Sequence, residues 1–194
     1  MPPLNNLDYR LSQLELTVKT HKHKGIDFTP VLDNLSMVQI GKYVFPAAAT
    51  SGNLSIPVRQ FLRVIISFGA KSGASDDYLR FGGASIDAGA NYAFINSGAA
   101  ARTSQNQIDI RDGANSALGA FSVIDIANNL STLVKSVSIH TIDKITSAAT
   151  SQTFYQIFGT WVNTTAFITQ LSLVSSGAQT YPADTTLIVL GSKE

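Results

Sequence analysis

The sequence contains no cysteine, few charged residues and no long apolar run, and each of these absences excludes a class of protein. Without cysteine there is no disulfide framework and no thiol chemistry. Charged residues make up 14% of the chain and the formal net charge is +1, so nothing electrostatic points to nucleic acid or an anionic membrane as a partner. No apolar run approaches the roughly 18 residues of a membrane span. The N-terminus lacks a basic and then apolar signal pattern, so Sec export is not expected.

Apolar residues near the N-terminus recur at the alternating three- and four-residue spacing of a coiled coil. They are Leu4, Leu7, Leu11, Leu14 and Val18. Isolated helices shorter than about 12–15 residues are marginal in water, so the seam needs a partner, and the simplest one is another copy of the chain. Gly25 ends the predicted helix. We therefore expect a coiled-coil anchor segment over 1–24 and an extended linker over 25–35, where Pro30 excludes helix.

Beyond residue 35 the helical periodicity disappears and apolar residues recur every second position. This pattern predicts ten strands: 36–45, 61–68, 78–82, 91–96, 106–111, 121–126, 132–142, 153–161, 166–174 and 185–190. In 106–111, Ile108 and Ile110 point to one face, and Gln107, Asp109 and Arg111 to the other. Short strands separated by turn clusters are typical of a sandwich or barrel. We predict a mainly β protein, with an antiparallel jelly-roll-like β-sandwich over 36–194 as its head domain.

Several short motifs follow one another in a fixed order within the predicted sandwich. They are Ile56-Pro57, Phe61-Leu-Arg-Val-Ile-Ile-Ser67, Tyr78-Leu-Arg-Phe-Gly82, Asn91-Tyr92, Gly159-Thr-Trp161 and Ala183-Asp-Thr-Thr-Leu-Ile-Val-Leu-Gly191. This order resembles a domain common in structural proteins of tailed bacteriophages. Two positions depart from it, since Gly82 stands where that domain usually has Asn and Leu190 where it usually has Tyr. The segment His21-Lys-His23-Lys-Gly25 also resembles the linkers of trimeric phage fibres.

The resemblance implies a structural protein of the virion, made in the host cytoplasm, and not an enzyme. It would form a homotrimeric tail fibre, head fibre or neck spike. Its N-terminal segment would bind other virion proteins, and its β-sandwich would face the exterior. One alternative is a receptor-binding adhesin head that attaches to host surface glycan, for which the sequence identifies no ligand-binding residues. The other is a capsid decoration or cement protein.

His21 and His23 are the candidate metal ligands. Residues two apart share a face in an extended segment. Around a trimer axis, such a pair from each of three chains would give six nitrogen ligands, which suit a divalent ion of iron, nickel or zinc. The resemblance to metal-holding trimeric fibres implies the same site. Alternatively, the pair only ends the coiled coil beside Lys22 and Lys24.

Other candidate sites in the predicted sandwich are weaker. His140 and Asp143 lie close in sequence, but no nucleophile elbow accompanies them. Asp76 and Asp77 are adjacent, so their side chains should diverge in an extended chain and not act as a glycosidase pair. Trp161, Tyr155 and Tyr181 are candidates for a sugar-stacking surface. No catalytic residue is predicted.

Overall fold

The computed structural model describes residues 36–71, 73, 75–96, 99–111, 119–129, 133–144 and 152–192. These residues form twelve β-strands and no helix. The strands are β1 (Met37–Val44), β2 (Ser51–Ser55), β3 (Phe61–Phe68), β4 (Asp77–Gly82), β5 (Tyr92–Asn96), β6 (Arg102–Gln105), β7 (Ile108–Arg111), β8 (Ala120–Ala127), β9 (Lys135–Lys144), β10 (Gln152–Trp161), β11 (Gln170–Ser175) and β12 (Thr186–Ser192).

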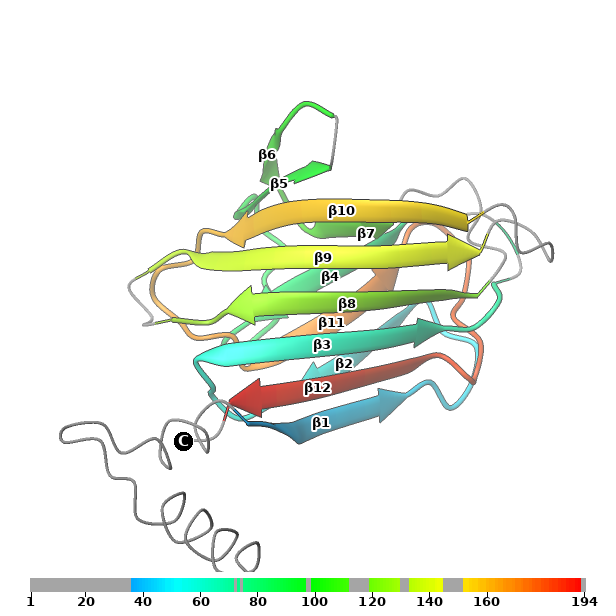
Figure 1. Cartoon of the computed structure of the whole chain (residues 1–194), viewed down its shortest axis with the longest axis horizontal. Coiled ribbons are helices and arrows are strands. Elements are labelled where there is room, and N and C mark those ends of the chain that lie inside the picture. Colours follow the sequence, from blue (N-terminus) through cyan, green and yellow to red (C-terminus); the bar gives the residue numbers. More distant parts are fainter. Residues whose placement is uncertain are drawn as a thin grey trace, which may run out of the picture. The chain divides into compact units, whose positions relative to one another are not determined.

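The strands form two antiparallel sheets that pack face to face (Figure 1). The large sheet has eight strands in the order β1-β12-β3-β8-β9-β10-β5-β6, and the small sheet has four in the order β2-β11-β4-β7. The predicted antiparallel β-sandwich is therefore confirmed. Each of the ten predicted strands has its counterpart, with ends shifted by a few residues.

Two strands, β2 and β6, were not predicted from the sequence. Strand β2 contains one large apolar residue, Leu54, and β6 contains none. Both strands lie at the edge of a sheet. An edge strand forms backbone hydrogen bonds with only one neighbour and needs little apolar surface of its own, so alternation gives no signal for it.

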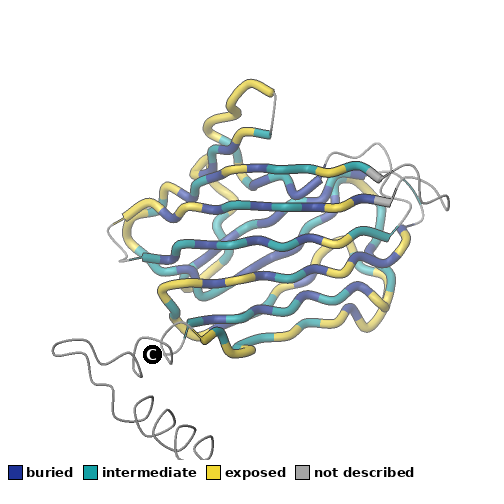
Figure 2. The backbone as a smooth tube through the Cα atoms, in the orientation of Figure 1, coloured by how far each residue is buried: buried dark blue, intermediate teal, exposed yellow. Residues whose placement is uncertain are grey.

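The core lies between the two sheets and is formed mainly by alternate residues of the strands, although β1 and β6 contribute no fully buried residue. In β3, Leu62, Val64, Ile66 and Phe68 are buried, as the alternation predicts. Figure 2 shows buried positions alternating with exposed or half-buried ones along the large sheet. Burying each such aliphatic or aromatic side chain contributes about 1.5–3 kcal/mol, so the core supplies the main stabilising term of the sandwich.

Strand register defines the two ends of the sandwich. At one end Met37 pairs with Ser192, and Lys135 pairs with Trp161. We call this the Trp161 end, and it is where β1 begins and β12 finishes. We call the opposite end of the sandwich the Asp77 end. Strand β4 begins there, and β7 and β9 end there.

Several predictions lie outside the described residues. They are the leucine seam, the linker over 25–35 and the ligand pair His21 and His23. Within the described ranges, no helix is long and apolar enough to cross a membrane.

Candidate functional site

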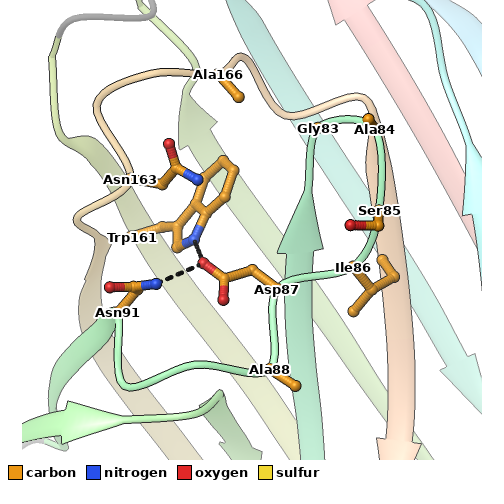
Figure 3. Close-up of a pocket in the computed structure, with 10 residues that line it drawn as sticks. All are labelled: Gly83, Ala84, Ser85, Ile86, Asp87, Ala88, Asn91, Trp161, Asn163 and Ala166. Atoms are coloured by element: carbon orange, nitrogen blue, oxygen red, sulfur yellow. Dashed lines mark hydrogen bonds between the residues drawn. The ribbon is translucent and has the colours of Figure 1, made fainter.

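A hollow at the Trp161 end is the candidate functional site (Figure 3). Its volume is about 350 Å³, and the loop over 83–88 forms most of its wall. That loop follows β4 directly, while Trp161 ends β10 and Asn163 follows it. The polar groups of Ser85, Asp87 and Asn163 line the hollow together with Ile86 and several small residues.

Asp87 organises the loop through three hydrogen bonds. Its Oδ1 accepts from the backbone N–H of Gly89 at 2.8 Å. Its Oδ2 accepts from Trp161 Nε1 at 2.8 Å and from Asn91 Nδ2 at 2.9 Å. Burial raises the pKa of the Asp87 carboxyl, but these three donors outweigh burial and lower its pKa below the ordinary value of 3.8. Asp87 is therefore an anionic acceptor at neutral pH.

Tyr92 fixes the same loop from inside the sandwich. Its hydroxyl accepts a hydrogen bond from the Phe81 backbone N–H at 2.9 Å and lies 2.8 Å from the Asp87 carbonyl oxygen, to which it donates. Burial raises the pKa of Tyr92, so the hydroxyl stays protonated and able to donate. The loop is thus held through both the backbone and the side chain of Asp87.

Trp161 is fully buried and belongs to the core. Its ring packs against Phe81, with centroids 6.2 Å apart, and the Lys135 ammonium lies 5.7 Å from the ring centroid. Tyr181 is fully buried as well. The sugar-stacking hypothesis is therefore wrong for both residues, because neither presents a ring face to a ligand. Tyr155 is half-buried.

The sequence motifs meet at this end. The carbonyl oxygen of Asn91 accepts from the N–H of Val162, which directly follows the Gly159-Thr-Trp161 motif, at 2.8 Å. Gly82 ends the Tyr78–Gly82 motif, and a Cβ there would lie 2.0 Å from the Ser85 carbonyl oxygen. This close approach leaves no room for a side chain at position 82.

Asp87 itself was missed at the sequence level. The available signal was the run Asp87-Ala-Gly89, since an Asp that accepts a hydrogen bond from the N–H two residues later is typical of an Asx turn. That signal predicts a turn, but not the bond to Trp161.

A second polar cluster is buried at the Asp77 end. Lys71 and Arg111 both form ion pairs with Asp77, and Arg111 Nη1 also lies 2.9 Å from Asp143 Oδ1. All four side chains are inaccessible to solvent. Two positive and two negative side chains balance each other, so the cluster carries no net charge. It joins β4 and β7 of the small sheet to β9 of the large sheet.

The two cations of the cluster also pack on aromatic rings. The Lys71 ammonium lies 4.4 Å from the Tyr181 ring centroid, and the Arg111 guanidinium lies 4.5 Å from that of Phe68. Lys71 donates to Ser75 Oγ at 2.9 Å and to Ser175 Oγ at 3.1 Å. Burial is the largest influence on the Lys71 ammonium and lowers its pKa, against the attraction of Asp77. Enclosed in this way, the cluster stabilises the fold and offers no group to a substrate.

The predicted orientation of Arg111 is wrong. Alternation predicted that Arg111 and Ile110 point to opposite faces of their strand, but both side chains are buried. The pairing of β7 with β4 explains the difference, because Tyr78 pairs with Asp109 and Asp77 with Arg111, which leaves Ile110 as an extra residue. Such a bulge turns the next side chain to the opposite face.

The weaker catalytic candidates do not assemble. His140 lies on the outer face of β9 and contacts Ser138, whereas Asp143 points into the core. Asp76 accepts from the Tyr78 hydroxyl at 2.9 Å, while Asp77 is buried, so the adjacent pair diverges as expected. Across the described parts of the chain, no three His, Cys, Asp or Glu side chains come together as metal ligands.

Comparisons with known proteins give little. No known family matches the chain, and no curated protein matches it. Among solved structures, peanut lectin with a nine-residue peptide is similar at 12% identity and a TM-score of 0.29, covering 81% of this chain and 87% of the lectin chain. A similarity this weak says nothing about what the chain binds.

Proposed function

We propose that this chain is a structural component of a phage virion. In this proposal it forms a trimeric fibre or spike on the tail, neck or head, its N-terminal segment sets the trimer and attaches it, and the β-sandwich faces the exterior. Its work is assembly and presentation, without catalysis.

The observation that carries the proposal is the contact among three of the six motifs on which the phage resemblance rests. Tyr78–Gly82 and Asn91-Tyr92 flank the loop over 83–90, and Gly159-Thr-Trp161 comes much later in the chain. Hydrogen bonds through Asp87 and Tyr92 link the three motifs into one unit. Residues that recur because they build one local structure should be found in contact, whereas a chance set of matches would scatter. The contacts therefore support treating the motifs as the signature of one domain type.

The test is to locate the chain in intact particles. Mass spectrometry of gradient-purified virions should detect it in constant proportion to the major capsid protein. Gold-labelled antibodies against the purified chain should mark a tail, neck or head appendage. Label spread over the whole capsid lattice would indicate the decoration or cement alternative. Absence of the chain from washed virions would overturn the proposal.

Receptor recognition is the second candidate, and the hollow beside Asp87 is the observation that favours it. Its carboxylate and amide groups are the kind that bind sugar hydroxyls. A glycan array probed with the full chain tests this role, with Asn163→Ala as the variant and Asn53→Ala, on the exposed surface of β2, as the matched control. Binding that Asn163→Ala weakens and Asn53→Ala leaves unchanged would support recognition at the hollow. Absence of binding across the array would remove the candidate.

A further inference from the structure

The outer face of the large sheet, which points away from the small sheet, exposes several large apolar side chains. Its most exposed large side chains include Phe154 at 60%, Phe61 at 51% and Phe158 at 48%. We name this surface the outer apolar face and define it by six exposed residues. They are Phe61, Ile95, Phe121, Ile142, Phe154 and Phe158.

Strand register arranges the apolar residues of this face in rows across neighbouring strands. Phe154 lies directly opposite Ile142, which lies directly opposite Phe121, so three exposed apolar side chains form one row across β10, β9 and β8. Phe158 lies opposite Ile95 in the same way. Half-buried Val123, Ile65 and Ile188 form the next row across β8, β3 and β12. Figure 1 shows these strands side by side, with the small sheet behind them.

Charge on this face is balanced internally. Among the described outward side chains of β3, β8, β10 and β12, only Arg63 and Asp125 are charged, and they pair with each other at 2.6 and 3.0 Å. Strand β9 adds His140 to the face, and exposed Lys42 lies beside it on the edge strand β1. A strongly acidic or basic partner would find no complementary field here. A second copy of the same neutral apolar face would meet no like-charge repulsion, so charge favours a copy of this chain as the occupant.

The size of the face fits an interface. The six adjacent strands from β12 to β5 span about 24 Å at about 4.8 Å per step, and eight-residue strands run about 26 Å. The projected area is therefore roughly 600 Å², close to the ~800 Å² that each partner contributes to a standard-size interface. Isolated exposed apolar residues are ordinary, but six large ones gathered on one sheet face favour an interaction surface.

We propose that copies of this chain pack against one another through the outer apolar face. The inference deepens the oligomer named in the proposed function, but it rests on the surface of the sandwich and does not require a virion.

Thiol accessibility tests the contact directly, since the chain has no cysteine of its own. Ser67→Cys places a thiol on the outer face between Phe121 and Thr186, and Ser51→Cys places one on the exposed face of β2. Both serines are exposed in the sandwich. In the assembled full-length chain, Ser67→Cys should react with a maleimide at least about 10-fold more slowly than Ser51→Cys. Equal rates would overturn the inference.

A second measurement identifies what covers the face. Phe121→Glu combined with Phe154→Glu should raise the oligomer dissociation constant at least about 100-fold in sedimentation equilibrium, because buried like charges repel. Val58→Glu, at a position of similar exposure outside the face, is the control and should change it little. Both variants should keep the strand signal in circular dichroism. In monomeric Phe121→Glu/Phe154→Glu protein, Ser67→Cys should become as reactive as Ser51→Cys.

Persistent protection of Ser67→Cys in that monomer would mean that the chain's own residues cover the face, which would overturn the inference. Failure of this inference can be distinguished from failure of the proposed function. Virion mass spectrometry detects the chain whatever surface its copies share, and thiol protection is measured on purified protein without virions.

Discussion

Trp161 and Asp87 are 74 residues apart in sequence and are joined by a hydrogen bond of 2.8 Å from the indole Nε1 to the carboxylate Oδ2. The bond attaches the loop that follows β4 to the last residue of β10. It therefore links the small sheet to the large one at the Trp161 end.

The first prediction uses this bond as a pH probe, since Trp161 is the only tryptophan in the chain. The pKa of Asp87 lies below its ordinary value of 3.8 because of its hydrogen-bond donors. As pH falls through that lowered pKa, the indole loses an anionic acceptor, so Trp161 emission should change at a pH below 3.8. Fluorescence titration between neutral and acidic pH measures this change.

Asp87→Asn is the control for that titration, and its emission should not show the same transition. The linkage has a definite sign. A carboxyl with a lowered folded-state pKa stabilises the fold above its unfolded-state pKa, and this stability is lost as pH falls through the folded-state value. The difference in melting temperature between the parent and Asp87→Asn should therefore be largest at neutral pH and shrink below pH 3.8. A constant difference would contradict the assignment.

The second prediction concerns the buried charge cluster at the Asp77 end. Arg111→Met should lower the free energy of unfolding by about 3–5 kcal/mol, because it leaves Asp77 and Asp143 with less compensation in a buried site. Arg102→Met breaks an exposed pair with Asp109 and should cost no more than about 1 kcal/mol. Chemical denaturation of both variants measures the contrast. Equal losses of unfolding free energy would show that the buried cluster contributes no more to stability than the exposed pair.

The third prediction concerns the leucine seam, which remains a prediction from sequence. Replacing Leu7 and Leu14 with Asp should weaken the trimer, because charges would be buried at core positions of the coiled coil. Light scattering of the parent and the variant gives the masses to compare. If the unmutated chain is a monomer, the expectation of an oligomer is wrong.

The fourth prediction concerns His21 and His23. If they bind metal across a trimer axis, a chelator should lower the melting temperature of the trimer. Acidification below the free imidazole pKa of about 6.5 should do the same. The double variant His21→Ala/His23→Ala should lose both sensitivities. If elemental analysis finds no iron, nickel or zinc, and the double variant melts at the same temperature as the parent, the metal site is wrong. The two histidines would then only end the predicted helix.

Sequence reasoning succeeded where a local pattern determines the structure. Alternation in the predicted segments 61–68 and 121–126 is set by burial of one face, and both strands form, as β3 and β8. It failed for β2 and β6, whose positions follow from pairing and not from apolar residues. The bulge that turns Arg111 inward was hidden for the same reason, because it depends on how β7 meets β4.

The candidate sites show the same limit. Trp161 stood out in the sequence, but its partner Asp87 did not, because no local pattern connects residues so distant. Lys71 and Asp77 are six residues apart, but Arg111 and Asp143 lie on two other strands, and only the packing of the two sheets brings all four together. Isolated charged residues in a sequence read as solvated surface, so a buried network of them is nearly invisible before the fold is known.

The position of β1 has a mechanical consequence. Strand β1 is an edge strand that pairs only with β12 in its sheet, in antiparallel orientation, and Met37 is the partner of Ser192. Antiparallel hydrogen bonds run perpendicular to the strands. Tension applied at Met37 along the strand axis therefore loads the whole β1–β12 ladder at once, in shear. Tension that separates Met37 from Ser192 sideways breaks the same bonds one after another. We expect the sandwich to resist a force applied at Met37 along the axis of β1. We expect it to open at lower force when Met37 and Ser192 are pulled apart.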